Sequence, residues 1–167
     1  MKRYKILFIC LGNICRSPAA EGIMLKKLGA RGLSDHFLVD SAGLLDYHAG
    51  ELPDVRMRKC GQARSYNFNS RSRPIKPDDI TNFDMLVCMD KSIVHSVEKR
   101  CTTQTDKEKI TLMTDYCVKL NAREVPDPYY GNTNDFNNVL DILEDSCDGL
   151  IEKCLVISDL CLVICDL

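Results

Sequence analysis

The sequence predicts a single α/β domain, a three-layer sandwich in which helices flank a parallel sheet of four strands. Three observations support this class. The length of 167 residues suits one domain. Short apolar, β-rich segments alternate with segments of helical periodicity, which is the order of strand–helix–strand units. The first apolar segment, Tyr4–Cys10, is nearly uninterrupted, as expected of a central strand buried on both faces.

The first half of the chain opens with one such unit. The predicted elements are a strand at Tyr4–Cys10, a helix over residues 17–32, a strand at His36–Gly43, a helix beginning near Pro53 and a loop over residues 64–79. In the first helix, Ser17 is the expected N-cap and Pro18 the first helical residue, and Gly29 or Gly32 is the expected end.

The second half continues the alternation. The predicted elements are a strand at Met85–Met89, a helix over residues 91–101, a short strand at Lys109–Met113, a turn-rich loop over residues 123–135 and a long helix over residues 135–155. We therefore expect one domain over residues 1–155, followed by an apolar C-terminal extension over residues 156–167. Helical spacing in the extension favours a longer last helix, with an association surface or a disordered tail as alternatives.

Composition excludes several classes of function. The formal net charge of −2 gives no basis for bulk nucleic-acid binding, so a site for an anion must be built locally. The ten cysteines contain no C-x-x-C pair and only three histidines accompany them, so we expect no zinc site. Several cysteines lie in apolar segments such as "MLVCM", which favours reduced thiols in a cytoplasmic protein over a secreted disulfide framework.

The N-terminus "MKRYKILFIC" has the basic start and apolar continuation of a signal peptide. Gly12, Asn13 and Arg16 interrupt the apolar run early, so a buried strand fits it better. No segment is long enough and free enough of charge to predict a membrane span. The C-terminus lacks the C-a-a-X arrangement of prenylation, because Ile164 is the fourth residue from the end.

The segment "CLGNICRS", residues 10–17, has the features of an anion-binding loop. It joins the carboxyl end of a predicted central strand to the N-terminus of a helix, where free N–H groups and a partial positive charge attract oxyanions. Gly12 and Asn13 can both take positive φ, which lets backbone amides curl inward. Arg16 adds a planar fork that suits two phosphate oxygens.

The same electrostatic field favours the thiolate form of Cys10, which is the nucleophilic form. Ser17 can donate its hydroxyl to the sulfur. The alternative is a chance match, since a chain with ten cysteines offers several positions for such a motif. Local features alone leave phosphoryl transfer, arsenate chemistry and simple anion binding open.

The loop "CLGNICRSPAAE" resembles the catalytic loop of the low-molecular-weight protein tyrosine phosphatases. Later segments resemble this family in the same order: "DSAG" at residues 40–43, "FDMLVCMD" at residues 83–90 and "VPDPYYG" at residues 125–131. The resemblance covers residues 4–155. It implies a four-stranded parallel sheet flanked by helices, a phosphatase activity, and neither a metal nor a cofactor.

The resemblance also implies roles for residues outside the loop. Asp127 matches the general acid that protonates the leaving oxygen, and the flanking prolines stiffen its loop. Tyr129 and Tyr130 match one aromatic wall of the substrate cleft, and Tyr47 the opposite wall, with Leu11 at the same cleft. Such a cleft favours aryl phosphates over phosphoserine, whose shorter side chain reaches less far.

The expected supporting residues are Asn13, Ser17, Ser41 and Asp90, of which Asp90 matches a carboxylate that orients Arg16. The expected phosphate-binding residues are Leu11, Gly12, Asn13, Ile14, Cys15, Arg16 and Ser17. One position departs from the family, because Ser70 stands where many members carry a histidine. The hydrogen bonds around Asn13 are therefore expected to differ.

Cys15 is the second thiol of the loop. In the family, the matching cysteine forms a disulfide with the nucleophile under peroxide, so Cys10 and Cys15 are a candidate redox pair. The plain alternative is a small side chain that fills space in the loop.

Three rival functions remain to be weighed. An arsenate reductase shares this fold and loop but needs two closely spaced relay thiols, whereas Cys88 and Cys101 are far apart. Arginine phosphatases carry threonine where this loop has Ile14. A binding module without catalysis would have lost Cys10 or Asp127. We therefore expect a cytoplasmic phosphatase, monomeric or weakly dimeric, that acts on phosphotyrosine proteins or small aryl phosphates and binds inorganic phosphate or similar oxyanions.

Overall fold

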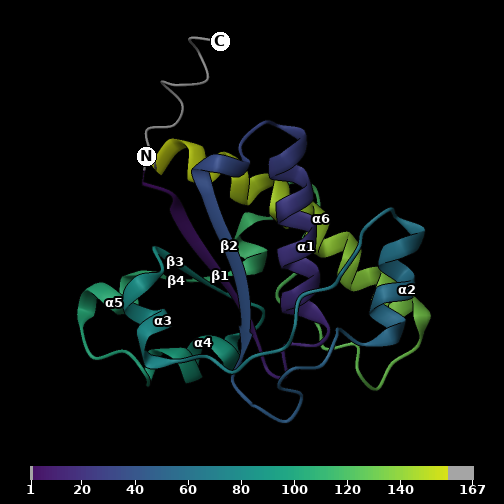
Figure 1. Ribbon diagram of the computed structural model, residues 1–167, viewed down its shortest axis with the longest axis horizontal. Coiled ribbons are helices and arrows are strands. Elements are labelled where there is room, and N and C mark those ends of the chain that lie inside the picture. Colours follow the sequence, from purple (N-terminus) through teal and green to yellow (C-terminus); the bar gives the residue numbers. More distant parts are fainter. Residues whose placement is uncertain (1, 158–167) are drawn as a thin grey trace.

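The computed structural model describes residues 2–157. A single parallel sheet forms its centre, with the strand order β2-β1-β3-β4 (Figure 1). The strands are β1 (Tyr4–Cys10), β2 (Phe37–Gly43), β3 (Met85–Cys88) and β4 (Ile110–Leu112). The chain leaves β1 toward β2 on one side and later returns to β3 on the other. The carboxyl end of β1 is therefore the topological switch point, where open α/β sheets bind ligands.

Helices cover both faces of the sheet, which confirms the predicted three-layer class. The helices are α1 (Arg16–Ala30), α2 (Val55–Ala63), α3 (Pro77–Asn82), α4 (Lys91–Glu98), α5 (Gln104–Glu108) and α6 (Thr133–Ile157). Figure 1 shows α1, α2 and α6 on one side of the sheet and α3 and α4 on the other. The two layers bury separate apolar clusters.

Strand β1 explains why its sequence is apolar at nearly every position. Ile6 and Phe8 pack into the cluster beneath α1 and α6, whereas Leu7 and Ile9 pack into the cluster beneath α3 and α4. All four side chains are completely buried. Successive side chains of a strand point to opposite faces, so a strand covered on both faces is apolar throughout.

The start of α1 differs from the prediction. The helix begins at Arg16, and its N-cap is Cys15, which makes no side-chain cap hydrogen bond. Ser17 is not the N-cap, because its hydroxyl is engaged by Cys10 and Asn13 instead. The helix ends at Ala30, shortly before Gly32 takes a φ of 68°.

Two short helices were not predicted. Helix α3 lies partly inside the segment 64–79 that was expected to be loop, because Pro77 begins it and Asp79 accepts a hydrogen bond from the backbone N–H of Lys76. Helix α5 begins where the Thr103 hydroxyl accepts a hydrogen bond from the backbone N–H of Asp106. Helices this short depend on capping and carry too little periodicity to be seen in the sequence.

The ring of Phe68 is wedged between α1 and α2. A Cβ atom added to Gly22 or to Gly61 would overlap this ring, so only glycine fits at both positions. Tyr66 stacks on Phe68 with ring centroids 5.6 Å apart. This packing fixes the start of the segment 68–73, which later contacts the loop over residues 10–17.

Helix α6 ends at Ile157, two residues into the expected C-terminal extension. The rest of the expected C-terminal extension, residues 158–167, lies outside the described residues. Within residues 2–157, the structure contains no helix with the length and apolarity needed to cross a bilayer.

Candidate active site

The loop over residues 10–17 curls at the carboxyl end of β1, between that strand and α1. Asn13 has a φ of 55°, as the sequence allowed, whereas Gly12 does not have a positive φ. Gly43 supports the loop from below, because a Cβ there would lie 2.9 Å from the carbonyl oxygen of Leu11 and 3.0 Å from the backbone nitrogen of Asn13. The end of β2 and the loop backbone are therefore in direct contact.

The sulfur of Cys10 lies inside this curl. The backbone N–H of Asn13 donates to it at 3.3 Å, and the Ser17 hydroxyl lies 3.0 Å away. The first N–H groups of α1 have no partners within the helix, and the positive end of the helix dipole faces the same region. This arrangement favours a negative charge on the sulfur and on an oxyanion above it.

The side-chain amide of Asn13 organises the hydrogen bonds below the loop. Its Oδ1 accepts from the backbone N–H of Arg73 at 3.0 Å, which fixes the orientation of the amide because that N–H can only donate. The Nδ2 then donates to the hydroxyls of Ser17 at 2.8 Å and Ser41 at 2.9 Å. Each serine oxygen accepts from Asn13, so each serine proton points away from Asn13. The Ser17 proton points toward Cys10 and the Ser41 proton toward Glu21.

Glu21 is the supporting residue that sequence reasoning missed. It is buried and accepts hydrogen bonds from Ser41 and Ser70. Burial, together with the nearby charge of Asp40, raises the pKa of Glu21. The hydroxyl of Ser70, where many family members carry a histidine, therefore ends this network at a carboxyl group.

The guanidinium of Arg16 is held on the opposite side of the loop. It donates to Asp90 at 2.6 Å and to the carbonyl oxygen of Val125 at 3.1 Å, and its Nη2 lies 3.5 Å from Asp127. Burial opposes the charged form of Asp90, but the hydrogen bonds from Arg16, from the start of α4 and from Ser92 outweigh it and lower the pKa of this carboxyl. The prediction that Asp90 orients Arg16 agrees with this geometry, and Asp90 is also the N-cap of α4.

The segment that carries Asp127 runs alongside Arg16. The Asp127 side chain is about half exposed, with a relative accessibility of 46%, and its Oδ1 accepts from the backbone N–H of Tyr129 at 3.1 Å. Tyr129 and Tyr130 follow at once and contact each other edge to face, with centroids 5.0 Å apart. The carboxylate and the two rings are therefore linked by direct contacts within one short segment.

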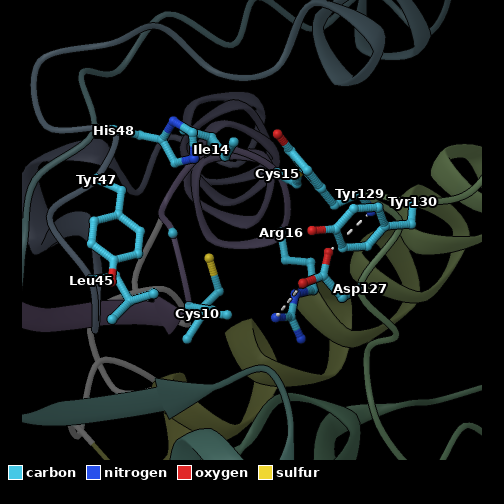
Figure 2. Close-up of a pocket in the computed structure, with 12 residues that line it drawn as sticks. Cys10, Ile14, Cys15, Arg16, Leu45, Tyr47, His48, Asp127, Tyr129 and Tyr130 are labelled. Atoms are coloured by element: carbon cyan, nitrogen blue, oxygen red, sulfur yellow. Dashed lines mark hydrogen bonds and ion pairs between the residues drawn. The ribbon is translucent and has the colours of Figure 1, made fainter.

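A cleft of about 300 Å³ opens above Cys10. Figure 2 shows Tyr47 on one side of it and Tyr129 with Tyr130 on the other, with the Cys10 sulfur between them and Arg16 and Asp127 on the tyrosine-pair side. The lining residues are Cys10, Leu11, Gly12, Ile14, Cys15, Arg16, Leu45, Tyr47, His48, Asp127, Tyr129 and Tyr130. Tyr47 and Tyr130 are strongly exposed, as expected of side chains that meet a partner molecule.

Two lining residues were not predicted. Leu45 and His48 flank the segment that carries Tyr47, and His48 hydrogen-bonds to Glu51 at 2.8 Å. Their only signal in the sequence is their proximity to Tyr47. Asn13, Ser17 and Ser41 do not line the cleft, because they are buried beneath the loop.

Cys15 lies in the wall of the cleft near Cys10. Burial raises the pKa of the Cys15 thiol strongly, and Asp54 and Cys10 add to the effect. At neutral pH, Cys15 is therefore a thiol and not a thiolate. Within the described residues, seven cysteines are free thiols: Cys10, Cys15, Cys60, Cys88, Cys101, Cys117 and Cys147.

The model of the low molecular weight phosphotyrosine protein phosphatase family matches residues 5–156. A putative low molecular weight protein-tyrosine-phosphatase of Synechocystis is 42% identical over 88% of this chain and 94% of its own length. A crystal structure of a protein tyrosine phosphatase from Entamoeba histolytica, with Hepes in its active site, is 47% identical with a TM-score of 0.87, covering 90% of this chain and 96% of that one. A Drosophila arginine phosphatase is 30% identical with a TM-score of 0.83, covering 89% of this chain and 96% of that one.

The sheet order and the cysteine–arginine loop at its switch point, taken together with these matches, place the chain in the class of cysteine-dependent phosphatases. The chain belongs to the low molecular weight phosphotyrosine protein phosphatase family. It is a protein tyrosine phosphatase of the low molecular weight type, a family that works through a cysteinyl-phosphate intermediate.

Proposed function

We propose that Cys10, Arg16 and Asp127 carry the hydrolysis of phosphotyrosine and other aryl phosphate monoesters in this protein. One observation carries the proposal. The Cys10 sulfur lies at an aromatic-walled cleft, within 3.3 Å of two hydrogen-bond partners and beside the one guanidinium and the one carboxylate that line this cleft.

In the first step, the Cys10 thiolate attacks phosphorus in line with the leaving oxygen. The sulfur–phosphorus bond forms as the phosphorus–oxygen bond breaks. The loop N–H groups and Arg16 hold the equatorial oxygens, and Asp127 in its acid form donates its proton to the leaving phenolate oxygen. Positioning and charge stabilisation supply most of the acceleration in phosphoryl transfer.

In the second step, a water molecule attacks the cysteinyl-phosphate. The Asp127 carboxylate accepts a proton from this water, so that it regains its acid form. The sulfur–phosphorus bond breaks, the Ser17 hydroxyl donates to the departing thiolate, and inorganic phosphate leaves the loop. The same contacts support binding of phosphate and similar oxyanions, in keeping with the sulfonate-bearing Hepes in the active site of the Entamoeba protein.

The aromatic walls support the choice of aryl phosphates. Tyr47 on one side and Tyr129 and Tyr130 on the other can stack on a phenyl ring. A phosphoserine side chain has no ring to place between them, so it loses this binding energy. We expect higher kcat/KM for phosphotyrosine peptides than for matched phosphoserine peptides.

Replacing Cys10 with serine tests the nucleophile. We expect Cys10→Ser to have no measurable turnover of p-nitrophenyl phosphate while still binding inorganic phosphate, measured by calorimetry. Cys101→Ser, a partly exposed thiol outside the cleft, is the matched control and retains normal rates. Normal hydrolysis by the Cys10 variant would show that the nucleophile is assigned wrongly.

The rival substrates are tested on the same preparation. The Drosophila arginine phosphatase has the same fold, so phosphoarginine and phosphotyrosine are compared directly. Ile14 in the cleft wall supports phosphotyrosine. Faster release of phosphate from phosphoarginine, or thiol-dependent reduction of arsenate, would replace the proposed substrate class.

We also propose that Cys10 and Cys15 form a redox pair. Peroxide oxidises the Cys10 thiolate to the sulfenic acid, and the Cys15 thiol then attacks this sulfur, forming a disulfide and releasing water. Both side chains line the cleft. After prolonged exposure to peroxide, the Cys10 of a Cys15→Ser variant is expected to be oxidised past the sulfenic acid to the sulfinic acid, which dithiothreitol does not reduce, whereas the unmodified protein is held at the disulfide and recovers. Equal recovery of both would exclude the pair.

The remaining expectations concern the protein in solution. A cytoplasmic location is supported by seven free thiols among the described residues, five of them buried. We expect a monomer or a weak dimer, which sedimentation velocity over a range of concentrations measures directly.

A further inference from the structure

Arg56 stands at the start of α2, outside the cleft, and its guanidinium is fixed by one carboxylate. The backbone N–H and the Nε of Arg56 donate to Asp54 Oδ1 at 2.8 and 3.0 Å, and Nη2 donates to Asp54 Oδ2 at 2.8 Å. Asp54 is also the N-cap of α2. A planar guanidinium bound through two of its nitrogens keeps a defined plane, unlike a freely rotating ammonium.

Asp54 connects this fork to the catalytic loop. Its backbone N–H donates to the carbonyl oxygen of Ile14 at 2.7 Å. Ile14 lies in the middle of the loop that surrounds the Cys10 sulfur, and its side chain lines the cleft. The position of the Arg56 guanidinium is therefore tied to the loop through a single intervening residue.

The other side of the guanidinium faces aromatic rings. Its central carbon lies 5.4 Å from the centre of the Tyr129 ring and 4.7 Å from that of the Phe136 ring. Phe136 is completely buried near the start of α6, so it cannot shift without disturbing the core. Cations within about 6 Å of a ring centre attract it. Arg56 thus contacts the Tyr129 ring and, at the same time, the immobile ring of Phe136.

Tyr129 in turn carries Asp127. Its backbone N–H donates to Asp127 Oδ1, and only Pro128 separates the two residues. Because the backbone of Tyr129 holds the carboxylate, a shift of Tyr129 that moves its backbone also moves the carboxylate of Asp127 relative to the Cys10 sulfur.

We propose that Arg56 is a positioning residue that sets the distance between the acid segment and the catalytic loop, through Tyr129 on one side and Asp54 on the other. It does not touch the substrate. Its effect on catalysis passes through the placement of the acid and of one aromatic wall. The inference rests on the proposed roles of Cys10 and Asp127.

The test is a leaving-group series on Arg56→Ala, with kcat/KM measured for phenyl phosphate and for p-nitrophenyl phosphate. A displaced acid matters most when the leaving oxygen is basic. We expect the loss of kcat/KM to be about 3- to 10-fold larger for phenyl phosphate, in line with the strength of a cation–π contact. Arg56→Lys keeps the charge without the fork and is expected to give an intermediate loss.

The matched control is Arg58→Ala on the same helix. Arg58 donates to the carbonyl oxygen of Pro53, and none of the described hydrogen bonds, ion pairs or ring contacts joins it to the acid segment. We expect its leaving-group dependence to be that of the unmodified protein. Thermal unfolding of both variants shows whether a general loss of stability accompanies either change.

A double-mutant cycle of Arg56 and Tyr129 shows whether Arg56 acts on catalysis through Tyr129. If Arg56 acts through Tyr129, the Arg56→Ala change costs nothing further in a Tyr129→Ala background. Equal losses for both substrates, or additive losses in the cycle, would overturn the inference. Asp127→Ala is measured in parallel. If it lacks a leaving-group dependence, the proposed acid role fails, and the cycle on kcat/KM alone still decides whether Arg56 acts through Tyr129.

Discussion

The hydroxyl of Ser17 lies 3.0 Å from the sulfur of Cys10, and its oxygen already accepts a hydrogen bond from Asn13. The Ser17 proton is therefore directed at the sulfur. A hydroxyl that donates to sulfur stabilises the thiolate more than the thiol or the phosphorylated sulfur. Its largest effect is expected where the thiolate departs, in the second step.

Ser17→Ala tests this directional hydrogen bond. We expect kcat to fall by roughly one to two orders of magnitude, the size of a hydrogen bond to a charged group. Because breakdown of the cysteinyl-phosphate slows most, rapid mixing with p-nitrophenyl phosphate should give a burst of nitrophenolate close to one equivalent. A smaller burst than in the unmodified protein would place the effect in the first step instead.

Asp127→Ala tests the acid. The loss of kcat/KM is expected to grow with the pKa of the leaving phenol, because a good leaving group departs without a proton and a poor one does not. A series of substituted phenyl phosphates measures this slope. An equal loss along the series would assign Asp127 a role other than proton donation.

Gly43→Ala tests the close approach between β2 and the catalytic loop. The added Cβ would lie 2.9–3.0 Å from three backbone atoms of the loop, which cannot move aside as a side chain can. We expect a loss of about 1–3 kcal/mol in the free energy of unfolding and weaker phosphate binding.

Gly29→Ala in α1 is the control for Gly43→Ala. Its added Cβ would meet only the Ser34 hydroxyl, at an ordinary 3.7 Å, and alanine favours a helix. Urea unfolding and phosphate titration of the two variants separate the loop effect from the loss of a glycine. Equal phosphate affinity in both variants would contradict the contact.

Asp90→Asn tests the charge pair with Arg16 while retaining an N-cap for α4. At pH 7 we expect the variant to be less stable by about 1–3 kcal/mol, since the pair is only partly shielded from solvent. The folded-state pKa of Asp90 is lowered, so its stabilisation is complete above the unfolded pKa of about 4 and is lost as the pH falls through the folded value.

Urea unfolding between pH 7 and pH 3 measures this pH dependence. The stability difference between the unmodified protein and Asp90→Asn should stay constant down to about pH 5 and shrink below about pH 4. A difference that grows toward low pH would have the wrong sign for a carboxyl with a lowered pKa.

The catalytic loop could be predicted because its chemistry and its local structure lie in one contiguous segment. Cys10 ends an apolar strand and Arg16 stands at the start of the next helix. Both the strand and the helix start can be recognised from the sequence around residues 10–17. Asp127 is more than a hundred residues away, and no local pattern links it to Cys10. Its place in the site, and that of Tyr47, came from the resemblance of the whole chain to a family.

The parts that were missed depend on tertiary contacts. Ser17 has the sequence position of an N-cap, but Cys10 and Asn13 compete for its hydroxyl and win. Glu21 looks like a surface charge until β2 brings Ser41 against it. Arg56 gains its neighbours only when α2 and α6 pack together. For Glu21 and for the ring contacts of Arg56, the partners are distant in sequence. For Ser17 the partners lie in the same loop, and the curl of that loop brings them to its hydroxyl.

The wedge formed by Phe68 has a consequence for how this family can vary. Gly22 and Gly61 leave room for the ring, so a larger residue at either position requires a smaller one at position 68. We expect these three positions to covary among relatives as a unit. The segment that follows Phe68 supplies the backbone N–H of Arg73 to Asn13 and the hydroxyl of Ser72 to the loop carbonyl of Gly12. The support of the catalytic loop therefore depends on matched side-chain sizes at positions 22, 61 and 68. None of these residues belongs to the phosphate-binding loop.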